Sequence, residues 1–425
     1  MIQLKPTPYN KFSCPECGSS HIHVHKSVFP GIHVMADAEC KDCGMEFYQD
    51  YPVGHAVDNP TAVGKRSQHF YIPESNNWKR ISVHLKHAFD NVHDEPIKIE
   101  RQVHKECKEV VILNTLDRLY GHVLLKLFNA QHYFDHAPED LGLVLIIPRM
   151  FAWLIPEGCA EVWIVDVKLG ESRKWLSALD EFVNQEMARF DRVYLSEAYS
   201  HPDFSKLDMS RFIGVKPFDL EEYETRRPQV TIIAREDRLW FESPLAEKLY
   251  KPFKKLGLQK FFVKRQNRLI NRTIRQLKKA IPHMKIYVVG LGGTGKISQY
   301  ATDLRSWKID LEVEKKWIDC YAKSHTVIGV HGSNMLLPTA MSAGCVEILP
   351  EGRYRNMVQD LAVRYYDRRQ LFFYRFAEQY VKPGSVTAIV REMLDNYPGF
   401  YRNMVKNLHK PEEFERLTDK SQTSS

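Results

Sequence analysis

The sequence predicts an α/β protein made of two consecutive domains with parallel sheets, which follow a small cysteine-rich module. Two observations predict the sheets: short apolar runs alternate with segments of helical period over residues 105–216, and the alternation starts again over residues 217–384. Strands of a parallel sheet are covered on both faces and are therefore continuously apolar. The third observation is that residues 1–60 contain two Cys-x-x-Cys pairs.

The composition excludes several classes of protein. The 425 residues are 44% hydrophobic and 12% aromatic, which is enough to bury several cores and excludes a disordered chain. No apolar run reaches the roughly 18 residues of a membrane span, and the N-terminus has no apolar segment of the kind found in secretory signals. We therefore expect a cytoplasmic protein. Its formal net charge of +7 suggests an acidic partner.

The two Cys-x-x-Cys pairs predict a zinc ribbon over residues 1–60. In a chain that is not secreted, such pairs indicate a metal site rather than disulfides. A glycine follows each pair and permits the tight turn that directs backbone amides toward sulfur. Because four thiolates would fill the coordination sphere, we expect a structural site and not a catalytic one. The predicted ligands are Cys14, Cys17, Cys40 and Cys43.

Three histidines lie between the cysteine pairs. His21, His23 and His25 alternate with apolar residues, which is the period of a strand. We favour a solvated strand face over a second metal site for them. Residues 61–104, which prolines interrupt repeatedly, are expected to be a connector.

The first α/β domain is predicted over residues 105–216. Its expected strands are 110–113, 143–147, 161–165 and 192–195, and its expected helices are 120–132 and 172–190. Residues 217–228 are acidic and rich in turn formers, which indicates a linker.

The second α/β domain is predicted over residues 217–384. Its expected strands are 229–234, 285–289, 326–330 and 345–349, and its expected helices are 264–280, 311–323 and 333–343. Residues 385–425 are expected to form two further helices, 385–396 and 401–409, and a polar tail.

Ligands of α/β domains bind at the carboxyl ends of the strands, so the strand–helix junctions of the second domain are candidate sites. The first junction, Gly290-Leu-Gly-Gly-Thr-Gly-Lys296, satisfies G-x-G-x-x-G and nearly satisfies the P-loop pattern. However, Ile297 stands where a P-loop needs Ser or Thr. We favour a turn that passes close to a ligand or to the neighbouring domain, with Gly292 and Lys296 as ligand contacts; a merely flexible loop fits the pattern equally.

The second junction follows the apolar strand that ends at Val330. Gly332 permits an unusual turn, and Ser333 or Asn334 is expected to cap a helix whose exposed amides attract a diphosphate. His331 is expected to point into the crevice between the domains. A capped helix with a structural histidine is the alternative.

The third junction supplies two arginines. Arg235 and Arg238 directly follow the strand at 229–234, and guanidinium groups pair well with diphosphates. With Glu236 and Asp237, the same arginines could equally form a surface ion network.

These residues carry a resemblance to a known family. The stretch 326–350 (TVIGVHGSNMLLPTAMSAGCVEILP) resembles the nucleotide-sugar-binding half of glycosyltransferases of the GT-B architecture, and it is most similar to glycosyltransferase family 61 and related bacterial polysaccharide-synthesis enzymes. The element at Arg235 and the segment 114–132 are also similar to that group. In that segment the family usually places an Asp after a histidine that opens a helix, whereas Val123 follows His122 here. The matching positions are His331, Gly332, Asn334, Pro338, Gly344 and Glu347.

The resemblance implies two Rossmann-like domains, an acceptor domain at 105–216 and a nucleotide-sugar-binding domain at 217–384. The implied activity is transfer of a sugar from a nucleotide-sugar donor to a hydroxyl of a saccharide or lipid-linked acceptor. Positive groups would stabilise the leaving diphosphate, and His122 or Asp117 would act as the base; a core or capping role for His122 fits as well. The chain contains no Asp-x-Asp pair, so we expect no catalytic metal.

The last feature is a basic run at 248–279, with twelve Lys and Arg and no acidic residue. A solvated helix face, contact with an anionic membrane and RNA binding all fit it. Of the two ligands we favour the membrane, with peripheral contact at its inner face, over nucleic acid. The alternative functions are a zinc-ribbon nucleic-acid-binding protein and a P-loop-like nucleotide-binding enzyme.

Overall fold

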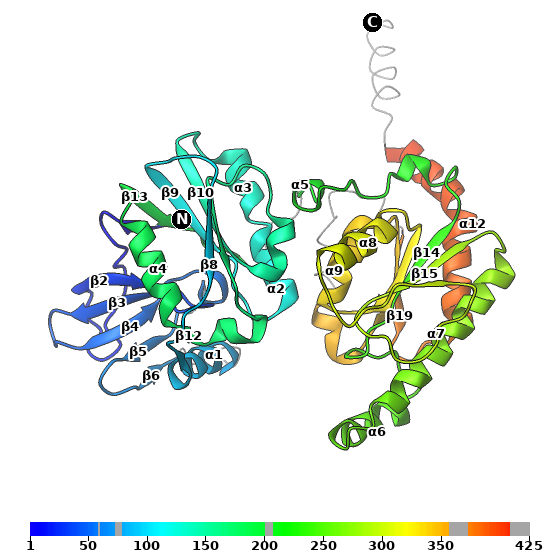
Figure 1. Ribbon diagram of the computed structural model, residues 1–425, viewed down its shortest axis with the longest axis horizontal. Coiled ribbons are helices and arrows are strands. Elements are labelled where there is room, and N and C mark those ends of the chain that lie inside the picture. The colour runs from blue at the N-terminus through cyan, green and yellow to red at the C-terminus, as the bar shows by residue number, and fades with distance from the viewer. Residues whose placement is uncertain (58–59, 73–78, 200–206, 357–372, 409–425) are drawn as a thin grey trace, which may run out of the picture. The chain divides into compact units, whose positions relative to one another are not determined.

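The structure is a computed structural model that describes residues 1–57, 60–72, 79–199, 207–356 and 373–408 (Figure 1). The chain divides into two compact units. Unit 1 comprises residues 1–203 and 211–213, and unit 2 comprises residues 204–210 and 214–425. Within the described residues, no helix combines the length and apolar character that crossing a bilayer requires.

The cysteine-rich module of unit 1 is a five-stranded antiparallel sheet. Apolar side chains of its first strand point inward, while His21, His23 and His25 are exposed, which confirms the solvated histidine face. Its last two strands lie in the segment that was expected to be a connector. The strands, in their order in the sheet, are β2 (Ile22–Val28), β3 (Met35–Cys40), β4 (Glu46–Asp50), β5 (Ala62–Gly64) and β6 (Phe70–Tyr71).

A second, six-stranded sheet has four parallel central strands and an antiparallel strand at each edge. All four predicted strands of the first domain are confirmed. The order is β1 (Ile2–Lys5), β13 (Arg192–Leu195), β9 (Glu109–Asn114), β10 (Leu141–Pro148), β11 (Glu161–Val165) and β8 (Ile99–Val103).

Helices cover both faces of this sheet, as a parallel sheet requires. Figure 1 shows α4 (Ser177–Met187) on one face, with α2 (Tyr120–Leu127) and α3 (Ala130–His136) on the other. The single helix expected at 120–132 was wrong: the Asn129 amide donates to Leu125 O and Lys126 O and ends α2 there. The remaining elements of unit 1 are α1 (Lys79–Asp90), the short strands β7 (Val92–His93) and β12 (Trp175–Leu176), and α5 (Ser210–Ile213), whose first residue belongs to unit 2.

The two sheets of unit 1 share one hydrophobic core, which runs from Cys14 and Val24 to Ile112 and Trp163. The connection between β2 and β3 reaches this core directly, because Phe29 N donates to Asp180 Oδ1 at 2.7 Å and Asn114 Nδ2 donates to Gly31 O at 2.8 Å. A side chain at Gly31 would lie 2.3 Å from Ser172 O, so only glycine fits there. The cysteine-rich module is therefore packed as part of unit 1.

Unit 2 contains six parallel strands in the order β16-β15-β14-β17-β18-β19. In chain order this is 3-2-1-4-5-6, the arrangement of doubly wound nucleotide-binding domains. All four predicted strands of the second domain are confirmed. The bounds are β14 (Gln229–Ile233), β15 (Lys285–Val289), β16 (Thr302–Asp303), β17 (Thr326–Val330), β18 (Cys345–Leu349) and β19 (Tyr374–Glu378).

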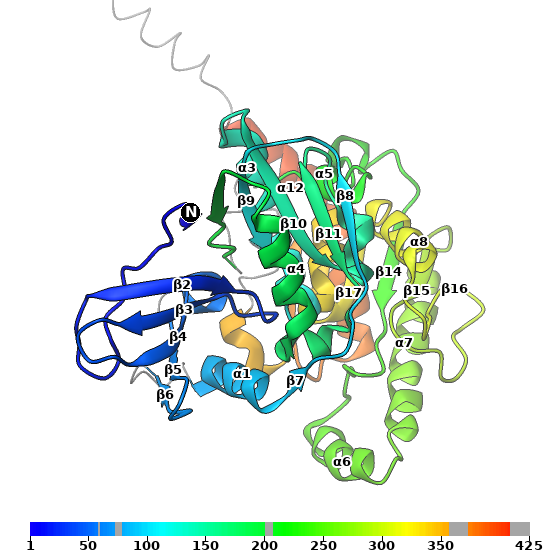
Figure 2. The ribbon, with the colours of Figure 1, turned by 60° about the vertical axis from the view of Figure 1, so that its left-hand side comes forward.

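The helices of unit 2 depart from expectation at three places, one of which is α6 (Pro244–Lys255), a helix that was not predicted from the sequence. The predicted helix 333–343 consists of a 3₁₀ turn, Ser333–Met335, followed by the six-residue α9 (Leu336–Met341), and the two C-terminal helices are one, α12 (Pro383–Leu408). The expected polar tail lies largely outside the described residues. The other helices are α7 (Lys260–Ala280) and α8 (Leu311–Ala322) (Figure 2).

The segment 217–228 is not a free linker. Phe218, Leu220 and Tyr223 are buried in the core of unit 2, and Phe218 N donates to Met341 O at 2.8 Å. This acidic, turn-rich segment therefore packs onto the domain that it precedes.

Candidate functional site

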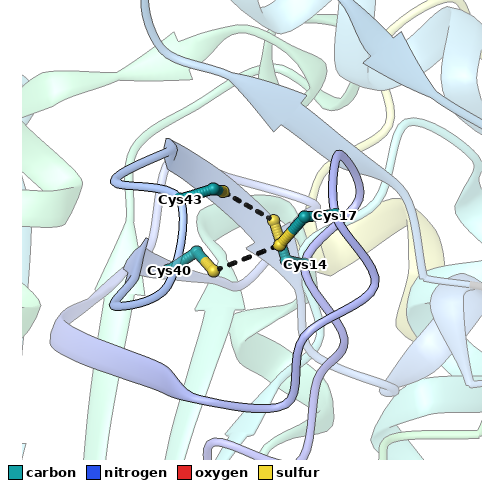
Figure 3. Close-up of side chains that lie close together, drawn as sticks. All are labelled: Cys14, Cys17, Cys40 and Cys43. Carbon is teal, nitrogen blue, oxygen red and sulfur yellow. Dashed lines mark hydrogen bonds between the residues drawn. The ribbon is translucent and has the colours of Figure 1, made fainter.

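The four predicted cysteine ligands converge at one point. Figure 3 shows Cys14 facing Cys43 and Cys17 facing Cys40, and both sulfur pairs are 3.6 Å apart. All four sulfur atoms lie within 4.8 Å of one another. Each pair ends in a left-handed glycine, whose N–H bonds back to the carbonyl of the first cysteine of its pair at 2.9 Å. The structure thus contains a four-cysteine cluster with the geometry of a tetrahedral metal site.

The thiols of this chain differ in their chemistry. Backbone N–H groups of Cys43 and Asp42, acting against desolvation, lower the pKa of Cys40 to about 6, which favours the thiolate that a metal needs. In the same cluster, although the backbone N–H of Met45 acts to lower it, the pKa of Cys43 is raised to about 12 by desolvation and the neighbouring thiols. Outside the cluster, burial raises the pKa of Cys159 and of Cys320 to about 12. Cys159 and Cys320 do not belong to the cluster. Among the described cysteines, those that could bind a metal together lie within residues 14–43.

In unit 2, the loops that follow β14 and β17 meet at the point where the strand order reverses. Arg238 Nη1, from the first loop, donates to His331 O in the second at 2.5 Å. Gly332 has a φ of +148°, and a Cβ there would lie 1.3 Å from Arg238 Nη1. Glycine is therefore required at position 332 because the guanidinium group lies against its backbone. Ligands of doubly wound domains bind at this reversal point.

The His331 side chain does not point into an open crevice. Its Nδ1 lies 2.9 Å from Glu347 Oε1, and both side chains are almost completely buried. The expectation that His331 lines the crevice was therefore wrong, because β17 and β18 are adjacent and the histidine pairs across them. The pair instead fixes the strand end from which the 331–335 loop begins.

The capping expected at this loop is also absent. The 3₁₀ turn has Gly332 at its N-cap, with no side chain in the cap. Asn334 Nδ2 donates backward to Val330 O at 3.3 Å. Ser333 and Asn334 are half-buried, so both side chains still border the solvent at the strand ends.

Arg235 is engaged by its own loop. Its Nε and Nη2 donate to the two carboxylate oxygens of Asp237 at 2.8 and 2.7 Å. Although burial raises the pKa of Asp237, the hydrogen bonds and charge of Arg235 bring it below its usual value. The sequence allowed two roles for these arginines, contact with a diphosphate or a surface ion network. Arg235 forms the ion pair, whereas Arg238 lies at the strand reversal.

The glycine-rich loop after β15 already holds an anion, the carboxylate of Glu236. Its Oε1 accepts from Gly293 N at 2.8 Å and Thr294 N at 2.6 Å, and its Oε2 accepts from Thr294 Oγ1 at 2.7 Å. A Cβ at Gly292 would lie 2.5 Å from this carboxylate. The loop therefore has the form of a backbone anion nest, but its occupant belongs to the chain itself.

The rest of this loop is held by α7. Asn267 Nδ2 donates to Thr294 O at 2.7 Å, and Asn271 Nδ2 donates to Lys296 O at 3.1 Å. Lys296 is exposed. In addition, the loop follows the second strand of the domain, whereas the dinucleotide fingerprint follows the first. The glycine loop thus meets the loop that carries Arg238 at Glu236, whereas Lys296 is exposed and its backbone is held by α7.

We expect that replacing Glu236 with Gln will lower the free energy of unfolding by about 1–3 kcal/mol, because two N–H groups lose a charged acceptor. Urea denaturation measures the change. Glu378→Gln, at an exposed position, is the control and should be neutral. Equal stabilities of the two variants would show that the loop does not depend on the carboxylate.

In unit 1, the two predicted catalytic residues lie together after β9. The buried Asp117 places Oδ1 3.3 Å from His122 Nδ1 and Oδ2 3.2 Å from Lys126 Nζ. Lys126 is buried as well and donates to Leu116 O at 2.9 Å. The His122 side chain remains 28% exposed. The buried carboxylate of Asp117 thus orients the imidazole of His122, and the buried ammonium group of Lys126 neutralises the charge of that carboxylate.

Lys126 was missed by sequence reasoning. It lies four residues after His122, so the two side chains share one face of a helix, and it is the one charged residue in an otherwise apolar segment, 123–128. A lysine in such a segment needs a buried counter-ion. That signal would have pointed to Asp117 as its partner.

Comparisons with known proteins give structural likenesses alone. No family model and no curated protein matches the chain. Among solved structures, the ADP-heptose lipopolysaccharide heptosyltransferase II of E. coli is 11% identical and covers 68% of this chain and 98% of its own (TM-score 0.34). E. coli heptosyltransferase WaaC with ADP is 12% identical and covers 67% and 99% (TM-score 0.37).

A third solved structure, the iron-containing dodecameric glycosyltransferase TibC of enterotoxigenic E. coli, is 11% identical and covers 81% of its own chain and 82% of this one (TM-score 0.28). These TM-scores are low, so the assignment of a function depends on the residues of this chain.

Proposed function

We propose that the protein is a glycosyltransferase of the GT-B type that moves a sugar from a nucleotide-sugar donor to a hydroxyl acceptor. One observation carries the proposal. Unit 2 is an all-parallel 3-2-1-4-5-6 sheet, and at its strand reversal Arg238 joins the loops after β14 and β17. That position in this topology is where nucleotides bind.

The donor diphosphate would lie at this reversal. As the sugar departs, negative charge develops on the diphosphate, and a fixed guanidinium group stabilises it without reorganisation. Arg238 is fixed by its bond to His331 O, while Arg235, a second guanidinium group on the same loop, is paired with Asp237. Ser333 and Asn334 would add hydrogen bonds. Because these protein groups supply the stabilisation, the proposed reaction uses no catalytic metal.

The acceptor hydroxyl would be deprotonated in unit 1. Asp117 is almost completely buried, whereas the His122 ring reaches the surface. Of the two candidates we therefore assign the base to His122 and a positioning role to Asp117, whose carboxylate favours the imidazolium that forms when the proton transfers. Asp117 supplies, from five residues upstream, a carboxylate partner for the histidine, although no Asp follows His122 in the sequence.

The other assignments follow from the same proposal. Zn²⁺ would occupy the four-cysteine cluster as a structural ion, since four thiolates in tetrahedral geometry suit zinc. The acceptor would be a saccharide or a lipid-linked saccharide in polysaccharide or glycoconjugate synthesis, and the protein would act in the cytoplasm. Affiliation with family 61 stays a prediction. A P-loop enzyme is not proposed, because Glu236 already bonds the loop amides that a phosphate would need.

Nucleoside diphosphates test the donor site. We expect at least one of UDP, GDP and ADP to raise the melting temperature, since binding to the native state alone stabilises it. Arg238→Ala should weaken that binding roughly tenfold or more, and Arg238→Lys should restore it only in part. Arg391→Ala, on the surface of α12, is the control. A protein that responds to none of the nucleotides would contradict the proposal.

A further inference from the structure

The hairpin formed by α6 and α7 exposes an unusual row of large apolar side chains. Leu245, Leu249 and Leu256 follow helical spacing along α6, and Leu258 and Phe261 continue the row through the turn into α7. These five side chains, called the leucine row below, are between 42% and 71% exposed. Figures 1 and 2 show α6 at the end of α7, away from the sheet of unit 2.

The four leucines of the row lie outside the core of the hairpin, because another face of α6 contacts α7. Phe261 borders that core, with its ring 6.3 Å from the ring of Phe253. Ala246, Tyr250 and Phe253 pack in a satellite core with Phe262 and Val263. The Phe262 ring lies 5.4 Å from that of Phe253 and 5.5 Å from that of Tyr250. This aromatic contact fixes α6 against α7, and the leucines of α6 remain exposed to solvent.

The turn between the helices is also fixed. Leu258 N donates to Phe253 O at 2.9 Å and Gly257 N donates to Lys254 O at 3.1 Å, with Gly257 at a φ of +73°. This is the Schellman pattern of a helix C-terminus. It holds Leu256 and Leu258 on either side of the glycine at the tip of the hairpin.

Positive charge surrounds the leucine row. The acidic side chains nearest the row in the sequence face other groups: Glu247 accepts from Gln379 and Tyr380 at 2.6 Å, and Glu242 pairs with Arg265. No acidic residue occurs from 248 to 279. The exposed lysines of residues 248–264 are Lys248, Lys251, Lys254, Lys255, Lys260 and Lys264.

We propose that the α6–α7 hairpin docks the protein on an anionic lipid surface, with the leucine row among the acyl chains and the lysines at the headgroups. Apolar side chains bordered by lysines are the composition of interfacial membrane helices, and each lysine near such a surface adds attraction. A nucleic acid would use the lysines but would give the aliphatic leucines no base to stack on. This docking assigns the membrane contact to the first half of the basic run, residues 248–264, and to the leucines beside it.

Flotation of the full-length protein with phosphatidylcholine vesicles, with and without phosphatidylglycerol, tests the docking. We expect binding to the anionic vesicles alone. Leu256→Glu with Leu258→Glu should weaken it roughly tenfold or more, because apolar burial is lost and repulsion is added. Lys315→Glu with Lys316→Glu, which makes a larger change of charge on the exposed face of α8, is the control and should bind as the wild type does.

A second readout does not depend on the double variant folding. Leu256→Trp should show a blue-shifted emission on anionic vesicles, as a side chain that enters acyl chains does. Absence of flotation, wild-type flotation by the leucine variant, or binding to single-stranded RNA in place of vesicles would each overturn the docking. This proposal depends on the hairpin alone and not on the transferase function. If the protein floats with anionic vesicles but no nucleotide raises its melting temperature, the transferase proposal is contradicted and the docking proposal stands.

Discussion

Replacing Cys40 with Ser is expected to lower the free energy of unfolding of unit 1 by about 4 kcal/mol or more, the range in which loss of a structural metal falls. The reason is the shared core. Cys14 and Cys40 are buried in the same cluster as Ile112 and Trp163 of the parallel sheet. Without a metal, the four sulfur atoms, which lie within 4.8 Å of one another, would lose the ion that bonds them to a common centre.

Metal analysis and denaturation together check this prediction. The wild type should contain about one zinc ion per chain, and Cys40→Ser should lose it together with the stability of unit 1. Cys107→Ser, at a half-buried cysteine outside the cluster, is the matched control and should keep the ion. Equal unfolding curves for the metal-loaded and metal-stripped protein would contradict the structural role, and iron in place of zinc would correct the identity of the ion.

Replacing His122 with Gln is expected to lower the rate of sugar transfer about 10²–10⁴-fold, the usual contribution of a general base. The affinity for the nucleotide should not change, because the proposed donor site consists of residues of unit 2. Single-turnover transfer assays and nucleotide titrations separate the two quantities. His136→Gln, at an exposed histidine of α3, is the control.

The outcome at Asp117 distinguishes a base from a positioning residue. Asp117→Asn keeps the size of the side chain but removes the charge opposite His122 and Lys126, so it should reduce both transfer and the stability of unit 1. Wild-type transfer by His122→Gln, with transfer lost only in Asp117→Asn, would show that the carboxylate and not the imidazole is the base.

The sequence predicted the eight inner strands of the two six-stranded sheets closely, and the physical reason is burial. The edge strands β1, β8, β16 and β19 were not predicted. Five predicted ranges, among them 161–165, 285–289 and 345–349, agree with the structure at both ends. Most positions of these strands are apolar because both faces of the sheet are covered, although β13 and β15 begin with the exposed Arg192 and Lys285. The cysteine ligands were equally accessible, since the spacing of two Cys-x-x-Cys pairs specifies their convergence.

The site residues were harder to place, because their positions depend on pairings that local sequence does not encode. His331 faces Glu347 only because β17 lies beside β18, and Glu236 reaches the glycine loop only because β14 lies beside β15. The helix expected at 333–343 failed for a local reason. Pro338 has no N–H and is tolerated only in the first turn of a helix, so α9 begins at Leu336 and is short.

The strand β1 links the beginning of unit 1 to its end. Ile2 pairs with Leu195 of β13, so the six-stranded sheet is complete only after the ribosome has made β13. The four cysteines, by contrast, lie within residues 14–43 and can bind an ion early in synthesis. Local contacts form faster than distant ones. During translation the metal site would therefore hold β2 and β3 in register until the strands of the six-stranded sheet have been synthesised and can pack against them.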